Sequence, residues 1–167
     1  MVIVVILFGW FFSQSYVVNF AEPDDLKLTI STEKEIINKT ENKSLMVNIK
    51  LTNIVNENLF VLNDFSINGL LEFKITIPSN NTIFPRHPQV DLTSKIRDTD
   101  YITLYPDDSI DITLDIFDYE YSVGQSGSDT DLYDWSENGN YKIQFEYDNF
   151  QSDEIIKSNI IEIRIED

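Results

Sequence analysis

Apolar residues recur at every second position along most of the chain after residue 25, and this spacing restricts the fold more than any other feature. A period of two is typical of β-strands that bury one face and expose the other, whereas helical periodicity is almost absent. The alternation predicts strands at residues 26–30, 45–51, 59–62, 71–77, 101–105, 110–116, 141–147 and 161–165.

Turn-forming residues separate these strands. Pro78 ends one of them, because proline cannot donate a hydrogen bond to a ladder, and Pro106-Asp107-Asp108 forms a turn before another. Short strands with such turns are expected to form two sheets, since each sheet buries only one face. We therefore predict an all-β fold, a single antiparallel two-sheet sandwich of seven to eight strands, with a barrel as the alternative. The chain contains no cysteine, so the fold must be stabilised by its hydrophobic core rather than by disulfide bonds.

The first 21 residues carry no charged side chain and are strongly apolar. Residues 2–12 match the apolar core of a secretory signal peptide, and Ser13 and Ser15 are small residues that suit cleavage after Ser15, with cleavage after Ala21 as an alternative. Uncleaved, residues 2–20 approach the length of a transmembrane anchor. A third interpretation is a buried first strand or helix of the domain.

The sequence thus predicts three parts. Residues 1–21 are a signal peptide or an N-terminal membrane anchor, residues 22–25 are an acidic spacer, and residues 26–167 are a single β-sandwich domain, because nothing in them suggests a second core. We expect a protein that is secreted or lies at the cell surface, where an N-terminal transmembrane helix is one way of holding it.

All 29 acidic and 12 basic residues lie beyond the leader, so the net charge of -17 belongs to the predicted domain. Such a surface repels phosphate backbones and anionic lipid headgroups, which argues against nucleic-acid binding and limits membrane contact to the N-terminal segment. It favours cationic partners, including metal ions. Solubility, or life in a salty environment, is the simpler explanation for the same charge.

The run Asn138-Gly139-Asn140-Tyr141-Lys142-Ile143 resembles the approach to strand F in immunoglobulin-like domains. In those domains a tyrosine near the strand start hydrogen-bonds back to the backbone upstream. The resemblance implies an immunoglobulin-like or fibronectin-III-like extracellular fold, with Tyr141 as that tyrosine and Ile143 where antibody domains place a cysteine. The turn at 106–109, the strand after it and the later Gly-x-Tyr also resemble extracellular sandwich modules and some bacterial peptidase inhibitors.

Signatures of catalysis are missing from the sequence. The chain has no thiol, and His87 is its only histidine, so a serine triad or a zinc site would depend on that single imidazole. No Gly-x-Ser-x-Gly motif accompanies it. Paired carboxylates could support glycoside hydrolysis, but no pair stands out among so many acids. We therefore expect a protein that is not an enzyme.

The connection at residues 117–138 is the strongest candidate site, because it is long, rich in acids and aromatics, and free of basic residues. We predict that four of its carboxylates gather around calcium, which tolerates irregular loop geometry. The spacing does not match an EF-hand loop, and a solvated acidic loop is the alternative. The predicted calcium ligands are Asp129, Asp131, Asp134 and Glu137.

Two further surfaces are candidates for binding a partner. Trp135 with Tyr133 or Tyr121 offers flat apolar faces for a sugar ring or a protein, although the same residues could pack into the core. Arg86 and His87 lie in a proline-rich loop that could be presented to a peptidase. The sequence as a whole predicts an exported, non-enzymatic binding or structural module at the cell surface with a protein or glycan partner. The alternative is a peptidase inhibitor or an accessory domain of a secreted enzyme system.

Overall fold

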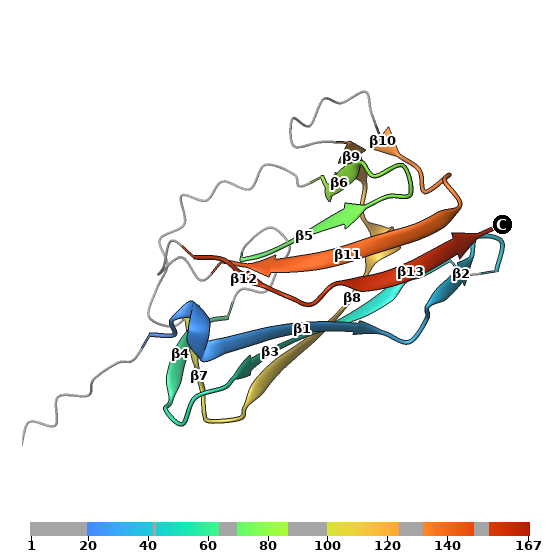
Figure 1. The fold of residues 1–167 in the computed structure, drawn as a ribbon. Coiled ribbons are helices and arrows are strands. Elements are labelled where there is room, and N and C mark those ends of the chain that lie inside the picture. The colour runs from blue at the N-terminus through green and yellow to red at the C-terminus, as the bar shows by residue number, and fades with distance from the viewer. Residues whose placement is uncertain (1–19, 42, 64–69, 87–99, 124–131, 149–153) are drawn as a thin grey trace, which may run out of the picture.

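The computed structural model describes residues 20–41, 43–63, 70–86, 100–123, 132–148 and 154–167. These residues form an all-β fold whose helical elements are short 3-10 turns (Figure 1). The strands are β1 (Leu26–Thr32), β2 (Ile36–Asn38), β3 (Met46–Asn53), β4 (Leu59–Leu62), β5 (Leu71–Thr76), β6 (Thr82–Pro85), β7 (Tyr101–Leu104), β8 (Ser109–Asp115), β9 (Tyr121–Val123), β10 (Leu132–Tyr133), β11 (Gly139–Tyr147), β12 (Ile156–Lys157) and β13 (Ile161–Glu166), and the 3-10 turns are η1 (Pro23–Asp25) and η3 (Ile116–Asp118).

All eight predicted strands are present, as β1, β3, β4, β5, β7, β8, β11 and β13. The described residues also contain five strands that were not predicted, namely β2, β6, β9, β10 and β12. Each has only two to four residues. Segments this short contain too few residues to show a clear alternation of apolar and polar side chains. The structure therefore has more strands than the seven to eight that the sequence predicted.

The described strands are arranged in three sheets. The first has the order β1-β3-β8, the second follows the path β10-β9-β6-β5-β11-β13-β2 with β12 paired to β11, and the third is the pair β4-β7. Every strand pair is antiparallel except that of β13 with β2, which is parallel. In Figure 1, β1 and β3 lie across from β11 and β13, as the two layers of a sandwich. The predicted all-β sandwich with antiparallel sheets is therefore confirmed, while the small third sheet β4-β7 and the parallel strand β2 are additions to the prediction.

The core lies between these layers and is built from the alternating residues that the sequence singled out. On β11, for example, Tyr141, Ile143 and Phe145 are fully buried while the residues between them face outward. The same pattern buries one face of β1, β3, β5 and β13. Burial of this apolar surface supplies the main stabilising term of the fold.

The chain enters the domain through the last two residues of the predicted leader and through the predicted spacer, residues 22–25. Ala21 is only 4% exposed and its N–H donates to the carbonyl oxygen of Phe60. Residues 23–25 form η1, and a carboxylate oxygen of Asp25 accepts from the N–H of Glu22 at 3.0 Å. Ordered packing therefore begins before residue 26, because apolar residues at positions 20 and 21 contact the β4–β7 pair. Residues 1–19 of the predicted leader lie outside the described residues. Within the described ranges, no helix is long and apolar enough to span a membrane.

Asn159 joins the two layers of the sandwich. Its side-chain oxygen accepts from the N–H of Ile30 at 2.8 Å, and its side-chain nitrogen donates to the carbonyl of the same residue at 3.0 Å. The amide thus takes the place of a neighbouring strand at the outer edge of β1. This arrangement satisfies backbone groups that would otherwise be open to another chain.

Candidate functional site

Five aromatic rings near β9, β10 and the start of β11 form one cluster, which we call the aromatic cluster. The centre of the Trp135 ring lies 4.9 Å from that of Phe117, 5.1 Å from that of Tyr121, 5.3 Å from that of Tyr141 and 6.0 Å from that of Tyr133. Trp135 is half-buried and its backbone has a φ of 59°, a conformation that is costly for a bulky residue. The packing of four rings around its indole holds it in this position.

The structure therefore brings together Tyr121, Tyr133 and Trp135, which the sequence proposed as a binding platform. Tyr121, however, is fully buried, so its side chain has no surface with which to contact a partner. Tyr133 and Trp135 keep partial exposure while they pack against the core. The geometry supports the alternative role that the sequence offered for these residues, which is packing at the edge of the sandwich.

A chain of hydrogen bonds runs through the same cluster. The hydroxyl of Tyr141 donates to the carbonyl oxygen of Glu137 at 2.7 Å. The hydroxyls of Tyr141 and Tyr133 are also 2.7 Å apart, and since the proton of Tyr141 is already used, Tyr133 must be the donor. Burial raises the pKa of Tyr141 well above its usual value, so the hydroxyl remains protonated and keeps its role as donor. The hydrogen bond predicted from Tyr141 to upstream backbone is present.

Two of the four predicted calcium ligands are described, and both already have partners. The Asp134 carboxylate accepts from the N–H of Ser136 at 3.1 Å, and hydrogen bonding to the side chain and then to the backbone of Ser136 lowers the pKa of Asp134. Glu137 uses both oxygens on Ser79, accepting from its N–H at 3.0 Å and its hydroxyl at 3.1 Å. Asp129 and Asp131 lie outside the described residues. Within the ranges that are described, no three His, Cys, Asp or Glu side chains gather closely enough to hold a metal ion, and calcium binding stays a prediction.

The predicted peptidase-facing loop is described only up to Arg86, and His87 lies outside the described residues. The N–H of Arg86 donates to the carbonyl oxygen of Glu120 at 2.7 Å. Its guanidinium also lies 3.7 Å from the Glu120 carboxylate, which is mostly exposed. Arg86 is thus attached to the chain just before β9.

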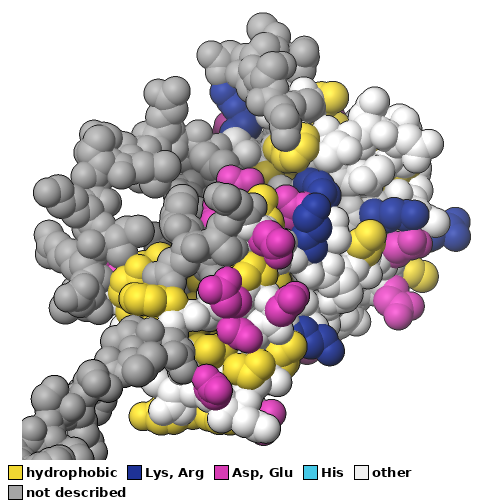
Figure 2. All heavy atoms as spheres, turned by 60° about the vertical axis from the view of Figure 1, so that its left-hand side comes forward, with side chains coloured by type: hydrophobic (Ala, Val, Ile, Leu, Met, Phe, Trp, Pro, Cys, Tyr) yellow, Lys and Arg dark blue, Asp and Glu magenta, His cyan; other side chains and the backbone are white. Residues whose placement is uncertain are grey.

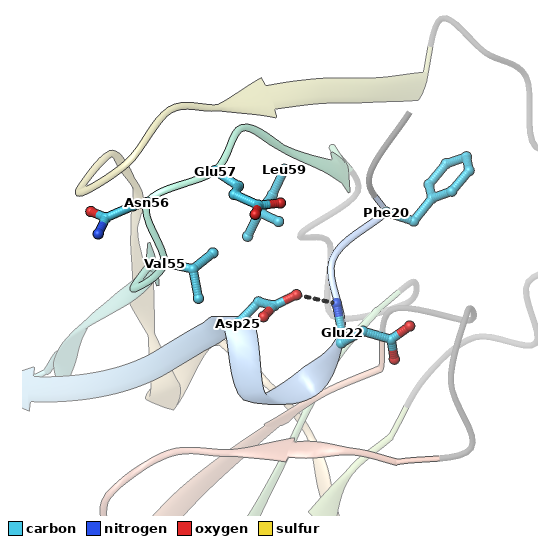
Figure 3. A pocket seen from close by; sticks show the side chains of 7 residues that line it. All are labelled: Phe20, Glu22, Asp25, Val55, Asn56, Glu57 and Leu59. Carbon is cyan, nitrogen blue, oxygen red and sulfur yellow. Dashed lines mark hydrogen bonds between the residues drawn. The ribbon is translucent and has the colours of Figure 1, made fainter. Parts of the chain in front are cut away.

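A pocket of about 510 Å³ lies at the end of the sandwich where the chain enters, and we call it the entry pocket. The sequence did not reveal it, because it forms between two segments that are at least 30 positions apart along the chain. The first segment includes residues 22–25, for which the sequence predicted a spacer. The pocket is lined by Phe20, Glu22, Asp25, Val55, Asn56, Glu57 and Leu59 (Figure 3).

The entry pocket combines apolar walls with carboxylates and has no basic residue in its lining. Leu59 is buried, whereas the ring of Phe20 is 47% exposed. In Figure 3 the carboxylates of Asp25 and Glu57 project into the space between Val55 and Phe20, and the dashed line marks the contact of Asp25 with the backbone of Glu22. A group with an apolar stem and a positive head fits this chemistry.

Asn53, which is fully buried, fixes the loop that carries one side of the pocket. Its side-chain nitrogen donates to the carbonyls of Glu57 at 2.8 Å and Leu104 at 3.1 Å, and its side-chain oxygen accepts from the N–H of Val55 at 3.0 Å. The conformation of the loop at residues 53–57 is therefore fixed in the absence of a ligand. Figure 2 shows that the face on this side of the molecule presents several acidic side chains beside apolar ones.

No family model and no curated protein matches this chain. Solved structures that resemble it include a mutant β-glucosidase from Listeria innocua in complex with laminaribiose, with 9% identity and a TM-score of 0.46 over 85% of this chain and 16% of that chain. A β-glucosidase from Erythrobacter marinus shows 14% identity and a TM-score of 0.40 over 84% and 15%. The GH3 β-glucosidase from Bifidobacterium adolescentis shows 15% identity and a TM-score of 0.36 over 84% and 17%. This chain spans only a small part of each, and the likeness does not show enzymatic activity.

Proposed function

We propose that this protein is an exported, non-enzymatic binding module of immunoglobulin-like fold that holds a protein partner at the cell surface through a cationic side chain. The strand order supports the fold. A three-stranded sheet β1-β3-β8 facing a sheet that contains β5-β11-β13 corresponds to the A-B-E and C-F-G strands of immunoglobulin domains. The hydrogen bond from Tyr141 to the backbone of Glu137 matches the tyrosine corner of that architecture.

The entry pocket is the observation on which the binding function rests. A lysine or arginine side chain would lay its methylene stem against Phe20 and Val55 and bring its positive head to the carboxylates of Asp25 and Glu57. The exposed ring of Phe20 adds a cation–π contact for the same head. A glycan offers no positive group for this site, and we therefore favour a protein partner.

Export is supported by the charge-free apolar segment at residues 1–21 and by the acidic composition of everything after it. We propose that this segment is a membrane anchor or contains a signal peptide that is cleaved after Ser15, because cleavage after Ala21 would remove Phe20 from the pocket. Because Phe20 and Ala21 contact the β4–β7 pair, the entry pocket would lie next to the point where the chain leaves the leader. A partner bound there would be held close to the membrane if the segment remains uncleaved.

Peptide binding to the purified full chain in mild detergent tests the proposal. The probe is a short peptide with a single lysine between alanines, and the control peptide carries acetyl-lysine, which lacks the charge. The variant Glu57→Gln removes a pocket carboxylate, whereas Glu33→Gln removes an exposed carboxylate elsewhere and changes the net charge equally. We expect acetylation and Glu57→Gln each to weaken binding about tenfold, the equivalent of one charge-assisted hydrogen bond. Equal loss in both variants would mean nonspecific attraction and would reject the pocket.

A further inference from the structure

β8 is an open edge of the three-stranded sheet. It pairs along its whole length with β3, and no other strand among the described residues pairs with it. The opposite edge of the sheet, β1, is different, because Asn159 bonds both backbone groups of Ile30 there. Among the described residues, no side chain bonds the outward backbone groups of β8 in this way. A seven-residue strand therefore has one side free to pair.

The backbone groups that face outward follow from the two hydrogen bonds that flank β8. The N–H of Asn53 donates to the carbonyl of Asp108 at 3.0 Å, and the N–H of Ile116 donates to the carbonyl of Leu45 at 2.9 Å. Residues of an antiparallel ladder alternate between pairs that exchange hydrogen bonds and pairs that do not. With Asp108 and Ile116 in bonded pairs, the backbone N–H and C=O groups directed away from β3 are those of Ser109, Asp111, Thr113 and Asp115.

The apolar face of β8 is also incompletely covered. Ile110, Ile112 and Leu114 point toward the core but are only half-buried. Their three partners on β3 have exposed fractions of 2% or less. The difference arises at the edge of the sheet, where β3 has a strand on each side and β8 has a strand on one side. An added strand would bury this residual apolar surface as well as pair with the backbone.

The charges around β8 select its partner. Two acids lie in the strand itself, two in the turn before it and two shortly after it, and residues 105–123 contain no lysine or arginine. A second copy of this strand would bring carboxylates against carboxylates, which destabilises cross-strand pairs. We propose that β8 binds an extended, basic segment of a partner protein, which adds to the sheet as a fourth strand. This surface is separate from the entry pocket and extends the proposed function.

The pairing predicts a pattern of hydrogen exchange that a charge effect alone would not produce. The probe is a ten-residue peptide in which lysine alternates with valine, added to the full chain in mild detergent. In the free protein the amides of Ile110, Ile112 and Leu114 should exchange slowly, while those of the outward residues Asp111 and Thr113 exchange fast. Peptide binding should slow the exchange of the outward amides at least about tenfold, with little change at the three others.

Two matched changes test whether backbone pairing holds the peptide. Thr113→Pro removes an outward N–H, whereas Thr113→Val keeps it, and both lose the hydroxyl bond to Asn48 at 2.7 Å. We expect Thr113→Pro to weaken peptide binding about tenfold and Thr113→Val to leave it unchanged. Methylation of alternate backbone nitrogens in the peptide should weaken binding to the wild-type protein by the same factor. The methylated peptide keeps the test valid if Thr113→Pro does not fold. Equal binding of both peptides would overturn the proposal, as would protection of the outward amides in a peptide-free dimer, which would make a second copy the occupant.

Discussion

Replacing Tyr141 with phenylalanine tests the hydrogen-bond chain that connects the aromatic cluster to the turn before β11. The substitution removes one oxygen and keeps the ring, so the contact with Trp135 at a ring distance of 5.3 Å is retained. What is lost is the bond donated to the carbonyl of Glu137 and the bond accepted from Tyr133. Tyr133→Phe is the matched variant, because it removes only the second of these bonds.

The magnitudes follow from this difference in the number of bonds. Each hydrogen bond contributes about 1 kcal/mol net, and a buried group left without its partner costs more. Tyr141 is fully buried, so we expect Tyr141→Phe to lower the free energy of unfolding by about 2–3 kcal/mol. Tyr133 is half-buried, and Tyr133→Phe should cost about 1 kcal/mol. For a domain of this size the larger loss lowers the melting temperature by about 4–10 °C.

Urea denaturation of the wild type, the two single variants and the double variant measures these terms as a cycle. Because the two residues share one hydrogen bond, Tyr133→Phe should cost little once Tyr141 is already phenylalanine, with a coupling energy of about 1 kcal/mol. The assay should also show an unchanged m-value, which would indicate that the fold is retained. The reasoning is refuted if Tyr133→Phe costs as much as Tyr141→Phe, or if the two effects simply add.

Three further predictions concern other parts of the structure. Asn53→Ala removes three hydrogen bonds from a fully buried side chain and should cost about 2–4 kcal/mol by urea denaturation, whereas a cost below about 1 kcal/mol would contradict the assigned bonds. Asn159→Ala opens the edge of β1 at Ile30, which should lower stability by about 1–3 kcal/mol and speed amide exchange there; unchanged exchange would exclude the cap. Burial raises the pKa of Tyr121 and Tyr141, so these tyrosines ionise at lower pH in the unfolded chain than in the folded protein. The free energy of unfolding should therefore be at its full value below about pH 10 and fall above it by up to about 1.4 kcal/mol per pH unit for each tyrosine. Tyr141→Phe should show a smaller slope, as measured by urea denaturation across this pH range.

The longer strands could be predicted because burial on one face leaves a visible period of two. β8 is an example, in which Ile110, Ile112 and Leu114 alternate with polar residues. The tyrosine corner could also be predicted, since it depends on a tyrosine at a fixed place near a strand start, and Tyr141 forms the expected bond. Both features depend on local sequence, and a single sequence records local order directly.

The features that were missed depend on residues that are distant in the chain. The entry pocket needs residues 20–25 beside residues 55–59, and no spacing rule connects these segments. The role of Trp135 was left open between a platform and the core, because aromatic content alone does not show which rings surround it. Asn159 was overlooked for a similar reason, as its partner Ile30 lies at the other end of the chain. Pairing between distant segments is set by the packing of the whole fold rather than by local pattern.

The two proposed binding surfaces are connected through one buried residue. The N–H of Asn53 donates to the carbonyl of Asp108, the last residue before β8, while its side chain fixes the loop that carries Glu57 in the entry pocket. The start of the open edge and the wall of the pocket are therefore held by the same residue, the first through its backbone N–H and the second through its side-chain amide. Asn53→Ala removes the side-chain bonds but keeps the backbone N–H that bonds Asp108, so it should weaken binding at the entry pocket more than pairing along β8. Glu57→Gln should weaken binding at the pocket only.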